Sequence, residues 1–201
     1  MKDSEFIRGN VPMTKEEVRL ITLDRLALND ARHFIDVGAG TGSIAIEAAL
    51  CFPQLQVLAI ERNPEAVELI QANCGKFNVN NVDIIHQSAP LDLPANWQQV
   101  DGIFIGGNGG NLHKIIDWSH QHLKPNGRLV LNFILLNNLM SALDYLKESQ
   151  FDAIDVVQLQ ISNLTTLGSG VYFKPNNPTF IISCHKTCNT TTKENTDANS
   201  D

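Results

Sequence analysis

The sequence contains few cysteines, and it has no long apolar run. Four cysteines in 201 residues, with no Cys-x-x-Cys pair, argue against a disulfide framework or a zinc ribbon. Cys51 and Cys74 fall on apolar faces of expected helices, so we expect buried free thiols there. No segment reaches the roughly eighteen uninterrupted apolar residues of a membrane span, and residues 1–6 lack the apolar core of a signal peptide. We therefore expect a cytoplasmic protein with no membrane partner.

Basic residues are also scarce. Lys and Arg number 15 against 22 Asp and Glu, which gives a formal net charge of −7 and no visible basic stripe. Proteins that bind nucleic acids usually carry such a stripe, so a nucleic-acid partner is disfavoured. The length and the 43% apolar fraction predict one globular domain over residues 1–186. Residues 187–201 are almost entirely polar and are expected to form a disordered tail.

Several catalytic motifs are missing as well. The chain has no Gly-x-Ser-x-Gly elbow and no P-loop lysine, so hydrolase and kinase functions lack support. His113, His120 and His122 fall in one expected helix, but their spacing does not match the usual zinc sites, and His120 and His122 point to different helix sides. We expect no metal site.

Apolar strands and amphipathic helices alternate along the first 150 residues. This alternation predicts a mostly parallel sheet with right-handed crossovers. Two strands that follow each other near the end, joined by a polar loop that contains glycine, predict an antiparallel edge hairpin. Thr14 and Glu17 form a capping-box pattern, which predicts that Thr14 caps a leader helix over residues 14–28. The strands are expected at 33–37, 57–60, 82–86, 101–105, 128–136, 153–161 and 179–185. Later helices are expected at 43–52, 112–123 and 139–149. A further helix is expected to begin at Pro64, with Asn63 as its N-cap.

Residues 34–42, Phe-Ile-Asp-Val-Gly-Ala-Gly-Thr-Gly, are the most informative stretch. A short strand runs into glycines at 38, 40 and 42, and a helix starts at Ser43, so main-chain N–H groups can cradle a ligand. A dinucleotide-binding fingerprint would have its third glycine at position 43. The observed spacing instead resembles the S-adenosylmethionine (SAM) cradle of Rossmann-like methyltransferases. The alternative is a glycine turn without a ligand, in which Asp36 only caps local backbone.

Three later segments bear on that choice. Glu61 ends the second strand, where a carboxylate can accept both ribose hydroxyls of an adenosine group, although an exposed strand-end glutamate would look the same. Ala89 follows the third strand, where such folds place a loop beside the adenine. Four glycines surround Asn108 after the fourth strand; they predict close backbone approach to a ligand, or else a flexible turn. The Asn/Asp-Pro-Pro-aromatic motif of amino-directed methyltransferases is absent there, which argues against N-methylation.

With these motifs the chain resembles the decarboxylating precorrin methyltransferases of cobalamin biosynthesis, which act at carbon 15 of the corrin ring. The resemblance runs from about residue 6 to residue 182 and implies a class I SAM-dependent methyltransferase fold, with a mostly parallel seven-stranded sheet and an antiparallel edge hairpin. It implies methylation of carbon 15 of (cobalt-)precorrin-6B with loss of the ring C acetate carboxyl group. The segments that carry the resemblance are 11–19, 36–43, 61–66, 89–90, 106–110 and 177–178.

The resemblance also implies a site and partners. Thr14, which could equally be only a helix cap, would then contact SAM as well. We expect an anionic precorrin substrate to lie near the basic and glycine-loop residues, with Arg8 and Lys114 as further candidate cations; no residue stands out as a catalytic acid or base. Similar proteins form homotetramers and often work beside, or fused to, a second methyltransferase module for carbon 5, which this chain lacks. The SAM-binding residues implied are Thr14, Gly38, Ala39, Gly40, Thr41, Gly42, Glu61 and Ala89, and the candidate substrate residues are Lys15, Arg19, Gly107, Asn108 and Gly109.

Two residues depart from the family pattern. Asn108 stands where the family usually has serine, and Asn163 stands where we expect an arginine that could pair with a substrate carboxylate. Two other functions stay open: an RNA or small-molecule methyltransferase on the same fold, and a SAM-binding subunit without turnover.

Overall fold

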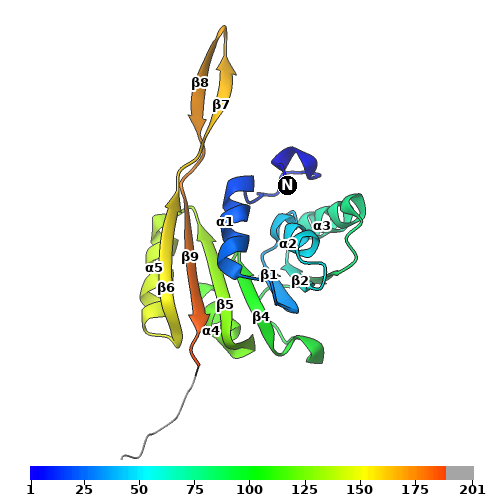
Figure 1. Ribbon diagram of the computed structural model, residues 1–201, viewed down its shortest axis with the longest axis vertical. Coiled ribbons are helices and arrows are strands. Elements are labelled where there is room, and N and C mark those ends of the chain that lie inside the picture. Colours follow the sequence, from blue (N-terminus) through cyan, green and yellow to red (C-terminus); the bar gives the residue numbers. More distant parts are fainter. Residues whose placement is uncertain (189–201) are drawn as a thin grey trace, which may run out of the picture.

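The computed structural model describes residues 1–188, and its body is one seven-stranded sheet covered by helices on both faces (Figure 1). The strand order is β3-β2-β1-β4-β5-β9-β6; β9 runs antiparallel to both of its neighbours, and the other pairs are parallel. The fold predicted from the sequence is therefore confirmed. The strands of this sheet are β1 His33–Val37, β2 Gln56–Glu61, β3 Val82–His86, β4 Val100–Ile105, β5 Leu123–Phe133, β6 Phe151–Leu159 and β9 Thr179–Lys186.

Five α-helices and two short 3-10 helices complete the body among the described residues. Residues of α1, α2 and α3 pack on one face of the sheet, and residues of α4 and α5 pack on the other. Because both faces are covered, the central strands are apolar on both sides, which explains their continuous apolar runs. The helices are η1 Asp3–Glu5, α1 Glu16–Leu26, α2 Ser43–Cys51, α3 Pro64–Phe77, η2 Ala95–Trp97, α4 Leu112–His122 and α5 Leu136–Lys147.

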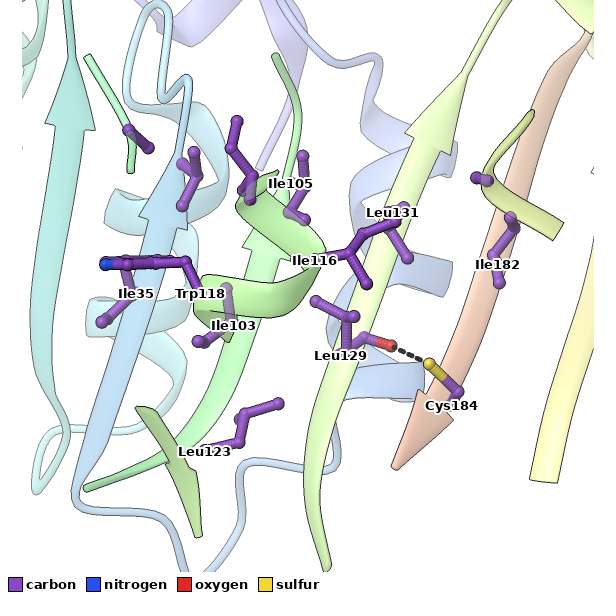
Figure 2. Packing of buried hydrophobic residues seen from close by; sticks show 14 of the residues in the cluster. Ile35, Ile103, Ile105, Ile116, Trp118, Leu123, Leu129, Leu131, Ile182 and Cys184 are labelled. Atoms are coloured by element: carbon purple, nitrogen blue, oxygen red, sulfur yellow. Dashed lines mark hydrogen bonds between the residues drawn. The ribbon is translucent and has the colours of Figure 1, made fainter. Parts of the chain in front are cut away.

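Figure 2 shows the core beneath α4, where Ile116 lies among strand residues such as Ile105 and Leu131. The buried Cys184 thiol lies 3.8 Å from the Leu129 carbonyl oxygen, and burial raises its pKa to about 12. Cys184 is therefore an unreactive thiol at neutral pH. The expectation of buried thiols is wrong for Cys51, which is exposed because it is the last residue of α2, and Cys74 is only partly buried.

The leader helix starts later than its capping pattern predicts. Lys15, not Thr14, is the N-cap residue, and among the described residues no side chain caps α1. Thr14 is instead part of the extended segment before the helix, and its carbonyl oxygen accepts a hydrogen bond from Arg19. The predicted cap of α3 is confirmed, since the Asn63 side chain accepts a hydrogen bond from the Glu65 N–H at 3.1 Å.

A second, two-stranded sheet projects beyond the body (Figure 1). It pairs β7 Ser162–Leu167 with β8 Gly170–Pro175, in a segment for which we expected only a polar loop. The loop prediction is wrong because Thr165, Thr166 and residues 171–173 favour extended structure, and Gly168 supplies the positive φ of +60° that a two-residue turn needs.

The expected tail comprises residues 187–201, and its residues 189–201 lie outside the described residues. Thr187 is held to the body, because its N–H and its hydroxyl both donate to the carbonyl oxygen of Gln150, at 3.2 and 3.1 Å. Of the helices formed by residues 1–188, none is long and apolar enough to cross a membrane.

Candidate functional site

A cavity of about 670 Å³ opens at the carboxyl ends of the parallel strands. This volume is within the range of small-molecule sites, and this edge of an open α/β sheet is where ligands usually bind. The cavity walls come mainly from seven segments that are far apart in the sequence: 11–15 before α1, 37–40 at the end of β1, 60–63 at the end of β2, 87–89 after β3, 106–109 after β4, 132–134 at the end of β5, and 175–177 with Thr179 at the base of the hairpin.

The glycine turn after β1 forms the floor of this cavity. Gly38, Gly40 and Gly42 all have positive φ angles, of +70°, +58° and +77°, which L side chains rarely adopt. A Cβ atom on Gly38 would lie 2.6 Å from the backbone nitrogen of Gly107. The turn and the glycine loop after β4 therefore touch backbone to backbone, and only glycine fits between them.

Glu61 links the glycine turn to the end of β2. Its Oε2 accepts a hydrogen bond from the Gly40 N–H at 2.9 Å, and its Oε1 accepts from the N–H groups of Arg62 and Asn63, both at 2.8 Å. A carboxylate offers about four acceptor positions, so three backbone bonds leave room for a ligand hydroxyl. Glu61 is thus fixed in place as an acceptor on the cavity wall.

Asp36 lies behind the turn rather than in the cavity. Its Oδ2 accepts a hydrogen bond from the Ala45 N–H at 3.1 Å, while its buried Oδ1 has no partner among the described residues. Burial, together with the nearby charge of Glu61, raises the pKa of Asp36 to about 7. The Asp36 carboxyl group therefore holds the start of α2 against β1. At neutral pH the solution is close to the pKa of this group.

The glycine loop is closed by its own asparagine. The Asn108 Oδ1 accepts a hydrogen bond from the Gly110 N–H at 2.9 Å. The Arg62 guanidinium lies against the same loop, because a Cβ atom on Gly109 would be 3.0 Å from its Nη1. Lys15, Glu61 and Arg62 are the charged residues among the described ones that line the cavity.

Most of the residues expected at the site meet at this cavity, but five do not. Thr41 and Gly42 are buried behind the turn, away from the cavity lining. Arg19 is completely buried below it and is occupied by protein groups, so it is not placed to contact a substrate. Arg8 and Lys114 are exposed outside the lining. The expected residues that line the cavity are Thr14, Lys15, Gly38, Ala39, Gly40, Glu61, Ala89, Gly107, Asn108 and Gly109.

Other lining residues were not expected from the sequence. Arg62 follows Glu61 directly, so its position at the end of β2 could have identified it. Asn132 sits near the end of β5, and its amide nitrogen donates to the Thr22 hydroxyl at 3.0 Å. Phe104 reaches the cavity from β4. Within residues 1–188, no group of three or more His, Cys, Asp and Glu side chains could hold a metal ion.

Comparison with known proteins identifies the family. Residues 5–186 match the family model of the precorrin methyltransferase domain. The chain belongs to this family. One relative is the cobalt-precorrin-6B C(15)-methyltransferase (decarboxylating) of Salmonella typhimurium. The two sequences are 54% identical over 187 residues, which cover 92% of this chain and 96% of the relative.

Solved structures of precorrin enzymes share the fold of this precorrin methyltransferase. The precorrin-6y C5,15-methyltransferase of Geobacter metallireducens superposes with a TM-score of 0.84 at 35% identity, covering 92% of this chain and 97% of that one. The precorrin 8W decarboxylase of Methanobacterium thermoautotrophicum gives 0.81 at 30% identity, covering 91% and 98%. The family predicted from the leader segment and the glycine loop is confirmed.

Proposed function

We propose that this chain methylates carbon 15 of cobalt-precorrin-6B, with SAM as the methyl donor, and removes the ring C acetate carboxyl group as carbon dioxide. The observation that carries the proposal is the glycine turn pressed against the glycine loop beside the fixed Glu61 carboxylate, in a chain of this family. Such a site offers backbone N–H groups and one acceptor to a nucleoside, and it leaves the adjoining part of the cavity for the methyl acceptor.

The residues present fit SAM. The turn at 38–40 gives the backbone approach that a Cβ atom would block, Glu61 has acceptor capacity for ribose hydroxyls, and Ala89 lines the cavity from the loop after β3. We infer that Thr14 and Ala39 complete this contact, and that Thr41 and Gly42 act by shaping the turn. When bound, SAM supplies a sulfonium methyl group that is electrophilic without protein assistance.

The protein then has to align the reactants and exclude water. SAM held here would supply the methyl group for a new bond to the macrocycle carbon, and its S–CH3 bond would break to leave S-adenosylhomocysteine. The electron pair of the bond broken in the loss of carbon dioxide would stay in the macrocycle, and the proton taken up where the carboxyl group was lost would be matched by one released from the methylated carbon. Among the described residues that line the cavity there is no histidine and no cysteine. We therefore infer that the chain binds and orients the substrate, and that water or the substrate itself carries the proton.

Positively charged side chains at the cavity favour the binding of an anionic substrate. Lys15 and Arg62 line the cavity beside Gly107, Asn108 and Gly109. The arginine expected at position 163 is absent, but Lys174 is the cross-strand partner of Asn163 and precedes Pro175, which lines the cavity. Cross-strand partners share one face of a hairpin, so Lys174 offers the positive charge that position 163 lacks.

We further propose that the enzyme works in the cytoplasm as a homotetramer, and that a separate methyltransferase acts at carbon 5. The relative from Salmonella typhimurium, of which 96% is covered, is named for carbon 15 alone, which leaves carbon 5 to another enzyme. The exposed apolar hairpin supports self-association, because single two-stranded hairpins are only marginally stable in water.

Mass spectrometry tests the reaction. The purified chain is incubated with cobalt-precorrin-6B and SAM that carries a ¹³C methyl group. We expect a product that has gained one labelled methyl group and lost one carbon dioxide, with the label at carbon 15 by NMR. Methyl transfer to bulk tRNA instead would support the RNA methyltransferase, and tight SAM binding without any transfer in a single turnover would support a non-catalytic subunit.

Substitution of Gly40 by valine tests the SAM site. Gly40 has a φ of +58°, and a Cβ atom there would lie 3.1 Å from the Pro12 carbonyl oxygen. We expect Gly40→Val to weaken SAM binding by about 100-fold, measured by calorimetry, because the strain and the clash move the turn away from the leader segment. Gly75→Val is the matched control, since a Cβ atom at Gly75 meets no atom within 4 Å. Equal SAM affinity in the two variants would contradict the proposed site.

A further inference from the structure

An exposed apolar ridge, made of Ile134, Leu135, Leu136 and Met140, borders the cavity where β5 passes into α5. These side chains are 59%, 65%, 57% and 47% exposed. Ile134 also lines the cavity, so the ridge is continuous with the proposed site. Leu136 and Met140 are four residues apart and therefore lie on one side of α5.

The ridge residues at the start of α5 do not stabilise this helix. Leu135 is the N-cap residue of this helix and Leu136 its first residue, and among the described residues no side chain caps the helix. Serine, threonine, aspartate and asparagine are preferred at an N-cap, while leucine is among the poorest choices. Apolar residues that break a local rule and stay exposed beside a cavity indicate a binding surface.

The chemistry of the ridge matches one face of a tetrapyrrole. Residues 129–143 contain no charged side chain, so the surface next to the cavity is apolar with a few amides and a hydroxyl. A tetrapyrrole has a broad apolar face and carries its carboxylates at the edge. The cationic Lys15 and Arg62 lie elsewhere on the cavity lining, on the leader segment and at the end of β2.

We propose that the apolar ridge binds the face of the tetrapyrrole substrate and thereby holds the ring with its reacting carbon in the cavity. This inference rests on the proposed function, whose substrate it needs. The ridge residues then determine substrate affinity, whereas the glycine turn and Glu61 determine SAM affinity. Exposure of these leucines in the free protein follows directly, because the ligand that covers them has to enter and leave.

Leu135→Ser tests this proposal with a variant that should fold well. Serine is a favoured N-cap, so the change improves the start of α5 while it removes apolar surface from the ridge. We expect the KM for cobalt-precorrin-6B to rise about tenfold, with kcat, the SAM affinity and the melting temperature not reduced. The matched control is Leu20→Ser on α1, where the leucine is 54% exposed and lies outside the cavity lining; we expect its KM to be unchanged.

Direct binding separates this proposal from the proposed function. Binding of cobyrinic acid, a stable corrin with free carboxylates, is followed by its absorbance, and the oligomeric state is followed by sedimentation velocity. If the wild type binds this corrin and Leu135→Ser weakens binding about tenfold, the proposed role of the ridge is supported even where no methyl transfer occurs. Equal corrin binding and KM in the two proteins, no corrin binding by the wild type, or a KM change that appears only with dissociation into smaller oligomers would each overturn it.

Discussion

At the scale of single residues, the buried carboxyl group of Asp36 is a source of pH dependence. Its pKa in the folded protein is about 7, against 3.8 for the ordinary group, so the folded state binds more protons than the unfolded state between these values. The free energy of unfolding should therefore decrease as the pH rises from about 4 to about 7 and level off above that. We expect Asp36→Asn, which keeps the acceptor for the Ala45 N–H, to gain about 2 kcal/mol relative to the wild type between pH 5 and pH 8.

Urea denaturation of both proteins across this pH range measures the difference. Asp101→Asn is a control that should lower the free energy of unfolding by an amount that stays constant between pH 5 and pH 8. Burial of Asp101 acts against its charge, but Lys124 and the N–H groups of Arg32 and His33 outweigh burial and lower the pKa of this carboxyl group. Its charge therefore stabilises the folded state at neutral pH, and this stabilisation is lost towards acid pH. An Asp36→Asn difference that does not change with pH would show that Asp36 is ionised throughout.

Lys174 provides a second prediction at this scale. If it replaces the expected arginine at position 163, Lys174→Ala should raise the KM for cobalt-precorrin-6B by about three- to tenfold, because one charge-assisted contact is lost. The SAM affinity should not change. Lys147→Ala on the exposed side of α5 is the control, since Lys147 pairs with Asp144 at the surface. Initial rates at several substrate concentrations distinguish the variants, and an unchanged KM for Lys174→Ala would exclude this role.

The sequence predicts some site residues much better than others, for a physical reason. Gly38 to Gly40 and Glu61 belong to motifs whose chemistry depends on the backbone and on strand ends, so their location follows from local pattern. Arg19 shows the limit, because a long side chain can turn either into the cavity or into the core, and only the packed structure decides which. Asn132 was missed because it lies within a mostly apolar strand, whose pattern does not show that this side chain borders the cavity.

At the scale of elements, Arg19 ties the segment before α1 to the rest of the fold. Its Nε donates to Glu47 at 2.6 Å, and its Nη1 donates to Asp3 at 2.7 Å and to the Thr14 carbonyl oxygen at 2.6 Å. Residues 11–15, which line the cavity, immediately precede α1 and are anchored through this fully buried side chain. The position of the leader segment thus depends on a residue that the ligand does not reach.

We expect Arg19→Lys to destabilise the protein by about 3 kcal/mol, because lysine cannot make the same three-way contact and leaves buried carboxylate oxygens unpaired. Amide hydrogen exchange in residues 6–15 should accelerate, and SAM binding should weaken. Arg25→Lys on the same helix is the matched control; Arg25 pairs with Asp155 at the surface, so its loss should cost below about 1 kcal/mol. Unchanged exchange in the leader segment of Arg19→Lys would contradict the anchoring role.

Most helices and strands can be predicted from the periodicity of apolar residues, but the residues at which they end, and short exposed strands, cannot. The strands β1 to β4 follow from apolar runs bounded by glycine, proline or polar residues. The start of α1 does not, because Thr14 fits a capping pattern while the chain stays extended for one more residue. The β7–β8 hairpin has no covered face, so its residues lack the alternation of apolar and polar side chains that marks a half-buried strand.

At the scale of the whole molecule, that hairpin is the part that the single chain leaves unsupported. Leu164 and Phe173 are cross-strand partners, and Val171 lies on the same face of the hairpin; the three side chains are 63%, 67% and 66% exposed. Lys174 is the one charged residue of the two strands. An apolar, nearly uncharged hairpin that projects from the body (Figure 1) is suited to pairing with its copies in other subunits.

The double variant Leu164→Asp/Phe173→Asp tests this assembly. The wild type should sediment as a tetramer at micromolar concentration, and the variant should sediment as a smaller species, because opposed aspartates repel each other and cannot be buried without cost. Since the base of the hairpin, residues 175–179, lines the cavity, loss of the assembly should also raise the KM for the tetrapyrrole. Leu20→Asp on α1 is the control for an exposed apolar residue made acidic, and it should keep the wild-type mass. A monomeric wild type, or a tetrameric double variant, would show that the hairpin does not hold subunits together.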